Sequence, residues 1–284
     1  MSDLVYVNGA FVARGEAKIS VFDRGFLFAD GIYEVCAVLD GRLVDNSAHL
    51  DRLDRSVAAI DLALPVARDA LIRVEKELVA RNGVAEGLVY MQVTRGAADR
   101  DFSFPAGATP TLIAFTQKKQ ILGAPAATAG VSAISTPDIR WARRDIKSVA
   151  LLAQVLAKQA ARRVGCAEAF MVEDGLVTEG ASSTVFIVTR EGEIVTRPLS
   201  TALLPGCTRK AVLRLAQETG MKIVERAFSI EEACVAAECF FTSATAFVMP
   251  VVSVDGRMIG AGKPGQATLR LREIYIETAR ATAE

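Results

Sequence analysis

Apolar and polar positions alternate over several short stretches in the first part of the chain, which is the pattern of half-buried β-strands. These stretches are residues 5–7, 31–39, 42–44, 88–94 and 111–115. Asn8-Gly9 and Asp40-Gly41 follow such stretches, and both dipeptides favour the tight turns of β-hairpins. Helical spacing of apolar residues predicts helices from His49 to about Ile60 and from Arg68 to Arg81.

The second part of the chain alternates between strand and helix patterns. Strands are predicted at residues 168–172, 184–188, 222–226, 239–242 and 247–254. Helices are predicted at 149–165, at about 208–219 and from about Gly265 onward. Ser229-Ile-Glu-Glu232 has the spacing of a capping box, which indicates the start of a further helix. The patterns together predict an α+β protein in which mainly antiparallel or mixed sheets pack against helices.

The segment Lys118-Lys-Gln-Ile-Leu-Gly-Ala-Pro125 has the composition of a linker. We therefore expect a small N-terminal α+β domain over residues 1–120, a linker over 121–125 and a larger C-terminal domain over 126–284. A chain of 284 residues is long enough for two cores of moderate size.

Composition narrows the kind of partner. Lys plus Arg and Asp plus Glu both number 33, so a net charge of zero argues against nucleic acid or an anionic membrane as partner. No apolar run approaches the roughly 18 residues of a membrane span, and the N-terminus lacks the pattern of a signal peptide. Five cysteines without a CxxC pair and a single histidine, His49, indicate neither a disulfide framework nor a metal site. We expect a cytoplasmic protein with a small-molecule substrate.

The stretch Trp141–Val149 places one lysine, Lys147, between a charged irregular segment and the predicted helix. Ser148 is the candidate N-cap. The apolar face of that helix comprises Val149, Leu152, Val155 and Leu156. A lysine whose stem packs on such a face, with other cations near its amine, can have a pKa low enough for a nucleophile. A solvated surface lysine is the alternative interpretation.

Three further segments carry candidate chemistry. Thr178-Glu-Gly-Ala-Ser-Ser183 presents one carboxylate, Glu179, followed by hydroxyls at a turn. Leu204-Pro-Gly-Cys-Thr208 runs into a helix, whose first N–H groups can bind a phosphate. Thr242-Ser-Ala-Thr245 ends a buried strand with hydroxyls. Each segment alone is explained by a turn or a helix start, but with Lys147 and an arginine they supply what pyridoxal phosphate requires.

The same residues carry a family resemblance that extends over essentially the whole chain. The ordered motifs are Asp23-Arg-Gly25, Asp30-Gly-Ile-Tyr33-Glu-Val, His49-Leu-Asp-Arg52-Leu, Val93-Thr-Arg-Gly96, Asp138-Ile-Arg-Trp141, Asp145-Ile-Lys147-Ser, Leu156-Ala-Lys-Gln159, Thr178-Glu-Gly180 and Thr242-Ser243. The chain resembles the fold-type IV pyridoxal-phosphate aminotransferases, and among them most closely the D-amino-acid aminotransferases. Branched-chain aminotransferases and aminodeoxychorismate lyases are more distant relatives.

The resemblance implies roles around a bound pyridoxal 5'-phosphate. Lys147 is the Schiff-base residue and moves the proton between substrate Cα and cofactor C4′, while Glu179 pairs with the pyridine nitrogen. The phosphate is held by Arg52, with a cup formed by backbone N–H groups of Cys207 and Thr208 and by the Ser243-Ala244 turn. Ser183 is also assigned to the cofactor. Where this chain has Ala244 the family often has a hydroxyl residue, but the backbone N–H can still donate.

The resemblance also implies a substrate side. Tyr33 helps to bind the substrate carboxylate, and Ser182 and Thr245 are assigned to the substrate pocket. Arg100 matches the arginine of an Arg-x-His carboxylate clamp, which the partner subunit contributes across a dimer interface. The third position of that clamp is Phe102 here, so one hydrogen-bond donor is missing. We therefore expect a homodimer with active sites at its interface.

The leading hypothesis is ping-pong transamination between a D-amino acid, D-alanine in type, and a 2-oxo acid such as 2-oxoglutarate or pyruvate. An (R)-selective primary amine:pyruvate aminotransferase is the nearest alternative, because Phe102 cannot donate to a carboxylate. A branched-chain L-amino-acid aminotransferase and an aminodeoxychorismate lyase are further alternatives, and a non-catalytic scaffold is the alternative outside enzymes. His49 is interpreted as support for the helix that carries Arg52 rather than as a catalytic group.

Overall fold

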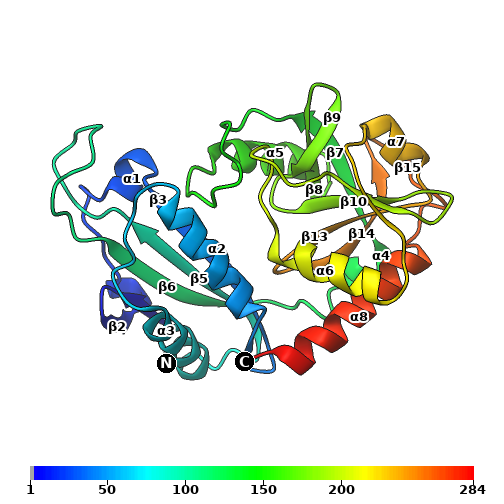
Figure 1. Cartoon of the computed structure of the whole chain (residues 1–284). Coiled ribbons are helices and arrows are strands. Elements are labelled where there is room, and N and C mark those ends of the chain that lie inside the picture. The colour runs from blue at the N-terminus through cyan, green and yellow to red at the C-terminus, as the bar shows by residue number, and fades with distance from the viewer. Residues whose placement is uncertain (1–2) are drawn as a thin grey trace. The chain divides into compact units, whose positions relative to one another are not determined.

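The computed structural model describes residues 3–284 and divides into two compact units, each a sheet with packed helices (Figure 1). Unit 1 is the chain up to Gln120 together with Ile146–Ala150 and Thr282–Glu284, and unit 2 is Ile121–Asp145 with Leu151–Ala281. The predicted α+β class is confirmed. The segment that contains Lys147 groups with unit 1, whereas the sequence placed it in the C-terminal domain.

Unit 1 is built on a six-stranded sheet in the order β2-β1-β6-β5-β3-β4, in which every neighbouring pair is antiparallel. Its elements are β1 (Leu4–Val7), β2 (Ala10–Ala13), a 3-10 turn (Arg14–Glu16), α1 (Arg24–Phe28), β3 (Gly31–Leu39), β4 (Arg42–Val44), α2 (Asn46–Ala58), α3 (Arg68–Arg81), β5 (Glu86–Thr94) and β6 (Thr111–Lys118). The helix α3 has the predicted bounds. The helix α2 begins three residues before His49.

The core of unit 1 lies between one face of this sheet and the helices α2 and α3 (Figure 1). Leu53 and Leu78 supply the helical side, and Ile32 and Val93 supply the sheet side, all fully buried. Since side chains alternate across a strand, the neighbour of Ile32, Tyr33, lies on the opposite face of the sheet. Of these two adjacent residues of β3, Ile32 therefore packs in the core and Tyr33 lies on the face of the sheet away from it.

Unit 2 is built on a nine-stranded mixed sheet in the order β12-β11-β10-β13-β14-β7-β8-β9, with β15 paired to β14. Its elements are α4 (Pro125–Ala129), β7 (Val131–Pro137), α5 (Leu152–Arg163), β8 (Glu168–Glu173), β9 (Leu176–Gly180), β10 (Thr184–Val188), β11 (Ile194–Thr196), α6 (Cys207–Glu218), β12 (Ile223–Glu225), α7 (Ile230–Val235), β13 (Glu238–Ser243), β14 (Phe247–Val254), β15 (Arg257–Met258) and α8 (Gln266–Thr282). The pairs β11–β12, β14–β7 and β7–β8 are parallel. The capping-box prediction for α7 is confirmed on its N-cap side, because the Ser229 hydroxyl accepts from the Glu232 N–H at 3.1 Å.

The helix after Lys147 begins later than its apolar pattern predicted. Ser148 is not its N-cap, since α5 starts at Leu152 and has Leu151 at the cap position. The chain just before it is extended instead, because Ser148 forms a β-bridge with Ile32 and the Val149 N–H donates to the Gly31 carbonyl at 3.0 Å. The predicted apolar face is exposed: Leu152, Val155 and Leu156 retain 72%, 58% and 54% of their accessible area.

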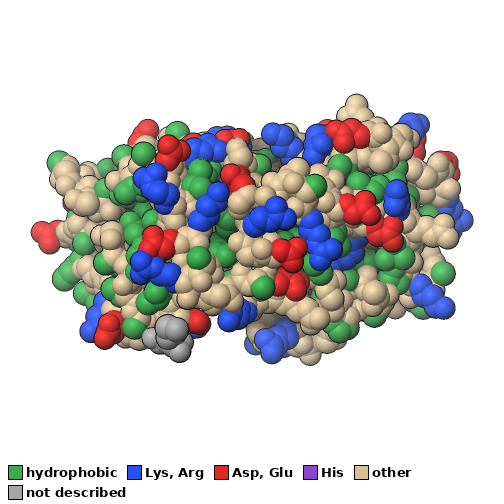
Figure 2. Space-filling view, turned by 90° about the horizontal axis from the view of Figure 1, so that it is seen from below, with side chains coloured by type: hydrophobic (Ala, Val, Ile, Leu, Met, Phe, Trp, Pro, Cys, Tyr) green, Lys and Arg blue, Asp and Glu red, His purple; other side chains and the backbone are tan. Residues whose placement is uncertain are grey.

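Charged side chains of both signs are interspersed on the face shown in Figure 2. This mixture matches a chain with 33 basic and 33 acidic residues. Among the helices of residues 3–284, none is both long enough and apolar enough to cross a membrane.

A buried carboxyl group lies between the helices of unit 1. Glu75 of α3 is 2% exposed and accepts a hydrogen bond from the Asn46 side chain of α2 at 2.9 Å. Burial raises the pKa of Glu75 from its usual 4.5 to about 7, against the smaller effect of that hydrogen bond. Between these values the folded protein binds a proton that the unfolded chain has lost. Folding stability therefore falls as pH rises through this window.

We expect Glu75→Gln to remove most of this loss of stability, because the amide stays neutral. The variant should be more stable than the parent by up to about 3 kcal/mol at alkaline pH, and similar to it near pH 4. Urea unfolding from about pH 4 to pH 8 measures the difference. Glu77→Gln on the same helix is the control, since Glu77 is partly exposed and pairs with Arg81. Parallel pH profiles for parent and Glu75→Gln would refute the assignment.

Candidate active site

Lys147 is fixed by its backbone beside the start of β3. Its carbonyl accepts from the Tyr33 N–H at 3.0 Å, and its own N–H donates to the Ser56 hydroxyl at 3.4 Å. The residues on either side, Ile146 and Ser148, are anchored in the core of unit 1 and in a β-bridge. The lysine thus projects from a short extended segment that the sheet of unit 1 holds in place.

The Lys147 amine lies over an aromatic ring rather than beside an apolar helix. Its Nζ is 4.1 Å from the centroid of the Tyr33 ring. Tyr33 stacks on Tyr90 at 5.6 Å, and Tyr90 stacks on Phe115 at 4.8 Å. Within residues 3–284 no carboxylate pairs with the amine and no hydrogen bond fixes it. A half-buried amine without an anionic partner is available for reaction with a carbonyl group.

Arg52 is held by the buried carboxylate of Glu34, which lies on the face of the unit 1 sheet opposite to Tyr33. Its Nε and Nη2 donate to the two oxygens of Glu34, each at 2.7 Å, and His49 Nδ1 lies 2.9 Å from Glu34 Oε2. Burial by itself raises the pKa of Glu34, but the Arg52 guanidinium and His49 outweigh it and hold that pKa well below its usual range. Arg52 is therefore a rigid, buried cation. His49 contacts Glu34 and Arg52, as its supporting role predicts.

Glu179 is a buried carboxylate in unit 2, at the end of β9 and 4% exposed. Arg140 Nη1 donates to its Oε1, and the Leu204 N–H lies 3.2 Å from each of its oxygens. Arg140 is oriented in turn by Asp138, which also accepts from the Thr178 hydroxyl at 2.6 Å. Burial raises the pKa of Glu179, while Arg140 and the Leu204 N–H oppose that rise. The Arg140 guanidinium therefore favours the ionised form of Glu179.

The start of α6 and the end of β13, two separate parts of the predicted phosphate cup, lie together in unit 2. The helix begins at Cys207 after Gly206, and no side chain caps it. A Cβ on Gly206 would lie 3.0 Å from the Thr184 hydroxyl oxygen, and Thr184 pairs directly with Thr242 across β10 and β13. Cys207 and Thr208 are both buried. The N–H groups of the first helical turn therefore face the same region as the end of β13.

Polar groups at this end of β13 lack partners. The Thr242 hydroxyl oxygen is buried and has no hydrogen bond. In the following turn the Ala246 N–H is used, since it lies 3.3 Å from the Ser243 carbonyl oxygen and 3.2 Å from its hydroxyl. The Ala244 N–H has no partner among residues 3–284. This region therefore has three features that suit an anionic group such as a phosphate. They are a buried hydroxyl without a hydrogen bond, a helix start without a side-chain cap and an unpaired backbone N–H.

The hydroxyl residues after Glu179 lie in different surroundings. Ser183 is buried, and its hydroxyl donates to Glu168 at 2.8 Å. Its side chain is thus engaged within unit 2. Ser182 is exposed, and Thr245, in the turn after β13, is half-buried. The sequence could not separate the two serines, because adjacent residues at a turn carry no periodic signal of burial.

Arg100 lies against two aromatic rings in unit 1. Its guanidinium carbon is 5.2 Å from the centroid of Phe28 and 5.5 Å from that of Phe102, and these two rings are 5.4 Å apart. Among residues 3–284 the guanidinium has neither an ion pair nor a hydrogen bond. Phe102 is 79% exposed. Phe102 therefore supports Arg100 by contact with its ring and leaves the N–H donors of Arg100 available.

The loop that carries Arg100 is anchored by Arg24, a role that the sequence did not predict. Arg24 is 3% exposed, and its Nη1 donates to the Asp101 carbonyl at 2.5 Å and its Nη2 to the Phe102 carbonyl at 3.4 Å. Its Nε donates to Asp30 at 2.8 Å, and Asp30 also binds Arg95 at the base of the loop. The signal was present in the Asp23-Arg-Gly25 motif, as it was for Arg140 in Asp138-Ile-Arg-Trp141.

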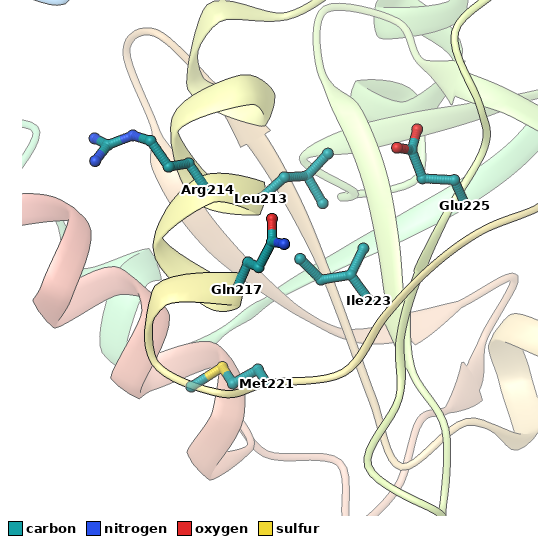
Figure 3. Close-up of a pocket in the computed structure, with 6 residues that line it drawn as sticks. All are labelled: Leu213, Arg214, Gln217, Met221, Ile223 and Glu225. Carbon is teal, nitrogen blue, oxygen red and sulfur yellow. The ribbon is translucent and has the colours of Figure 1, made fainter.

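A surface depression of about 570 Å³ lies elsewhere in unit 2 (Figure 3). It is lined by Leu213, Arg214, Gln217, Met221, Ile223 and Glu225. Its charged residues are engaged, since Arg214 pairs with Glu218 at 3.0 Å and Glu225 with Arg209 at 2.5 Å. None of the candidate catalytic or cofactor residues lines it.

Residues 31–254 match the family model of amino-transferase class IV. The chain belongs to this family. It is 41% identical over 287 residues to the D-alanine aminotransferase of Bacillus licheniformis, covering 97% of this chain and 99% of that protein. It is 38% identical to the D-alanine aminotransferase of Staphylococcus haemolyticus, covering 96% of this chain and 98% of that protein. The predicted membership of the fold-type IV aminotransferases is confirmed.

Solved structures show the same fold. The branched-chain amino acid aminotransferase of Escherichia coli superposes with a TM-score of 0.92 at 25% identity, covering 100% of this chain and 97% of that one. A second branched-chain amino acid aminotransferase, solved with pyridoxamine 5'-phosphate, superposes with a TM-score of 0.91 at 27% identity, covering 99% and 95%. The branched-chain aminotransferase of Thermoproteus uzoniensis with norvaline has a TM-score of 0.86 at 26% identity, covering 99% and 96%. Fold alone therefore does not separate enzymes of different substrate preference.

We expect Arg24→Ala to release the loop around Arg100, because two backbone carbonyls lose a buried charged donor. Amide exchange of residues 99–104 should accelerate by about tenfold or more. Hydrogen exchange read by mass spectrometry measures this. Arg14→Ala is the control, since Arg14 is 77% exposed and lies 3.9 Å from its one partner, Asp3. Unchanged exchange in the loop would show that Arg24 does not anchor it.

Proposed function

We propose that this protein catalyses ping-pong transamination between a D-amino acid, D-alanine in type, and a 2-oxo acid such as 2-oxoglutarate or pyruvate. The observation that carries the proposal is the agreement, at 41% and 38% identity over nearly the whole chain, with two D-alanine aminotransferases. An accessible amine on Lys147 and a buried, cation-paired carboxylate on Glu179 support it. Pyridoxal 5'-phosphate is the cofactor.

Lys147 and Glu179 are the residues that we propose act on the reacting part of the cofactor. When bound, the cofactor supplies an electron sink for the charge that develops at substrate Cα. The Lys147 amine moves the proton between that carbon and cofactor C4′. Glu179 holds a proton on the pyridine nitrogen, and Arg140 favours the ionised carboxylate that this task needs. Ser183, whose hydroxyl is bound to Glu168, would act through its backbone.

The phosphate is proposed to be held by Arg52, by N–H groups of Cys207 and Thr208, and by the Ser243-Ala244 turn. The uncapped start of α6 and the unpaired N–H of Ala244 support this assignment in unit 2. Arg52 would contribute a cation whose direction Glu34 fixes with two hydrogen bonds. A hydrogen bond from such a cation to a phosphate oxygen would contribute about 1.5–3 kcal/mol to binding.

The substrate carboxylate is proposed to bind Arg100 and Tyr33, with Ser182 and Thr245 in the remainder of the pocket. Arg100 has unpaired donors and two supporting rings. Phe102 occupies the position of a donor in the D-specific clamp, so the carboxylate has one hydrogen bond fewer. This observation favours the second candidate function, an (R)-selective primary amine:pyruvate aminotransferase.

The protein is proposed to act as a homodimer in which the Arg95–Pro105 loop of one copy completes the site of the other. Large apolar side chains are exposed on both units, which supports self-association. They include Phe26, Phe102, Leu152, Val155 and Leu156. Light scattering at assay concentration tests this, and a fully active monomer would contradict it.

The cytoplasm is the proposed location. An odd number of cysteines, five, suits a reducing compartment better than a disulfide framework does. Cell fractionation tests this, and recovery of the protein with membranes would exclude it.

A screen of single half-reactions separates the candidate functions. Loss of the yellow absorbance of the loaded enzyme is followed with D-alanine, D-glutamate, L-leucine and (R)-1-phenylethylamine. Fast reaction with the two D-amino acids supports the proposal. Reaction with the primary amine alone would replace it by the second candidate, and preference for L-leucine would replace it by a branched-chain aminotransferase.

We expect Lys147→Ala to abolish turnover and the yellow absorbance, because no other lysine among residues 3–284 is held over the Tyr33 ring. Borohydride reduction of the parent fixes the cofactor to the lysine that it has joined, and peptide mapping identifies that residue. Lys76→Ala, at an exposed position of α3, should retain both properties. Label on a lysine other than Lys147 would end the assignment.

We expect Arg100→Ala to weaken kcat/KM for D-alanine by roughly 10- to 150-fold, the equivalent of one charged hydrogen bond. A primary amine without a carboxylate should lose far less, and Phe102→His should shift preference towards D-amino acids. Both variants are assayed with D-alanine and (R)-1-phenylethylamine.

Phe104→His is the control for that experiment, because its ring packs 3.5 Å from the Arg95 guanidinium carbon rather than on Arg100. It should leave the ratio of the two substrates unchanged. Equal losses for both substrates in Arg100→Ala would make Arg100 a structural loop residue.

A further inference from the structure

One buried guanidinium in unit 2 binds four carbonyl groups. Arg272 of α8 is 6% exposed. Its Nη1 donates to the carbonyls of Ala246 and Val248 at 2.8 and 2.9 Å. Its Nη2 donates to those of Ile121 and Leu122 at 2.8 and 3.4 Å. The side chain therefore joins the turn after β13 to the segment where unit 2 begins.

The positive charge of Arg272 has no carboxylate beside it among residues 3–284. Burial lowers the pKa of Arg272, and no anion offsets this effect. Burying a cation that has only carbonyl dipoles around it costs folding free energy. This cost suggests that the charge has a function.

The turn that Arg272 holds has a constrained backbone. Phe247 lies between the two bound carbonyls and has a φ of +59°, which is unfavourable for a residue with a side chain. Its buried ring packs edge-on against Tyr275, with 4.9 Å between centroids. Tyr275 lies three residues after Arg272, on the same side of α8. Two side chains of one helix therefore keep Phe247 in this conformation.

We propose that Arg272 is a positioning residue for the phosphate of the cofactor. The turn that it fixes begins at Ser243 and contains the unpaired N–H of Ala244. Its guanidinium binds the Ala246 carbonyl of this turn, and its positive charge favours a dianion bound at the turn. The inference rests on the proposed function in one respect, the assignment of the Ser243-Ala244 turn to the phosphate.

The test measures ligand binding rather than turnover. Apoprotein is titrated with pyridoxal 5'-phosphate, with pyridoxal, which lacks the phosphate, and with inorganic phosphate. The variants are Arg272→Met, which loses both charge and hydrogen bonds, and Arg272→Lys, which keeps the charge. Arg270→Met is the matched control on α8, because Arg270 is 59% exposed and pairs with Glu273 at 3.4 Å.

Arg272→Met is expected to weaken pyridoxal 5'-phosphate and inorganic phosphate by about tenfold or more, with pyridoxal nearly unchanged. The affinity of Arg272→Lys for these two ligands should lie between that of Arg272→Met and that of the parent. Because the charge is buried, the difference from the parent should depend on salt concentration less than it would for a surface charge. Should Arg272→Met fail to fold, the preference of Arg272→Lys for pyridoxal 5'-phosphate over pyridoxal decides the question.

Equal losses for pyridoxal and pyridoxal 5'-phosphate would overturn the proposal, since Arg272 would then act on the whole fold. Affinities within about twofold of the parent for all three ligands would also overturn it. The outcome is independent of the proposed reaction. A parent protein that binds the cofactor but does not transaminate D-amino acids would refute the function and leave this test valid.

Discussion

The pairing of residues 146–150 with the first residues of β3 is the constraint on which the candidate site depends. A β-bridge between Ile32 and Ser148 and a backbone hydrogen bond on each side of it hold Lys147 in an extended segment. The same pairing places the Lys147 amine over Tyr33 and prevents the helix from starting before Leu152. A flexible lysine is converted in this way into a group with a defined position, which is what a reacting amine requires.

Two buried charge pairs near the candidate site, one in each unit, share one arrangement, in which a carboxylate and a guanidinium orient each other. Glu34 binds Arg52 in unit 1, and Glu179 binds Arg140 in unit 2. Removing one partner of such a pair leaves an uncompensated buried charge, so each pair is rigid even where its net stabilisation is small. Arg272 departs from this arrangement, because carbonyl groups alone surround it, and the departure lies next to the proposed phosphate turn.

Patterns of apolar residues predicted several regular elements with their bounds. The helix α3 was predicted from apolar residues at helical spacing, and the strands β10 and β14, which are buried along nearly their whole length, from short apolar runs. The prediction failed at residues 149–151, where apolar residues with helical spacing are exposed or paired with β3. Helical spacing of apolar residues indicates that they share one face of a helix. It does not indicate whether that face packs in a core or, as in α5, is exposed.

The sequence by itself determined the α+β class, the family and the chemical identity of the lysine and the carboxylate, because ordered motifs and residue chemistry are local properties. Tertiary structure alone decided which group each of these residues meets. It set Lys147 over an aromatic ring, directed the Ser183 hydroxyl to Glu168, and made Arg24 the anchor of the Arg100 loop. These contacts join residues far apart in the chain, and their geometry depends on how strands and helices pack, which no local pattern encodes.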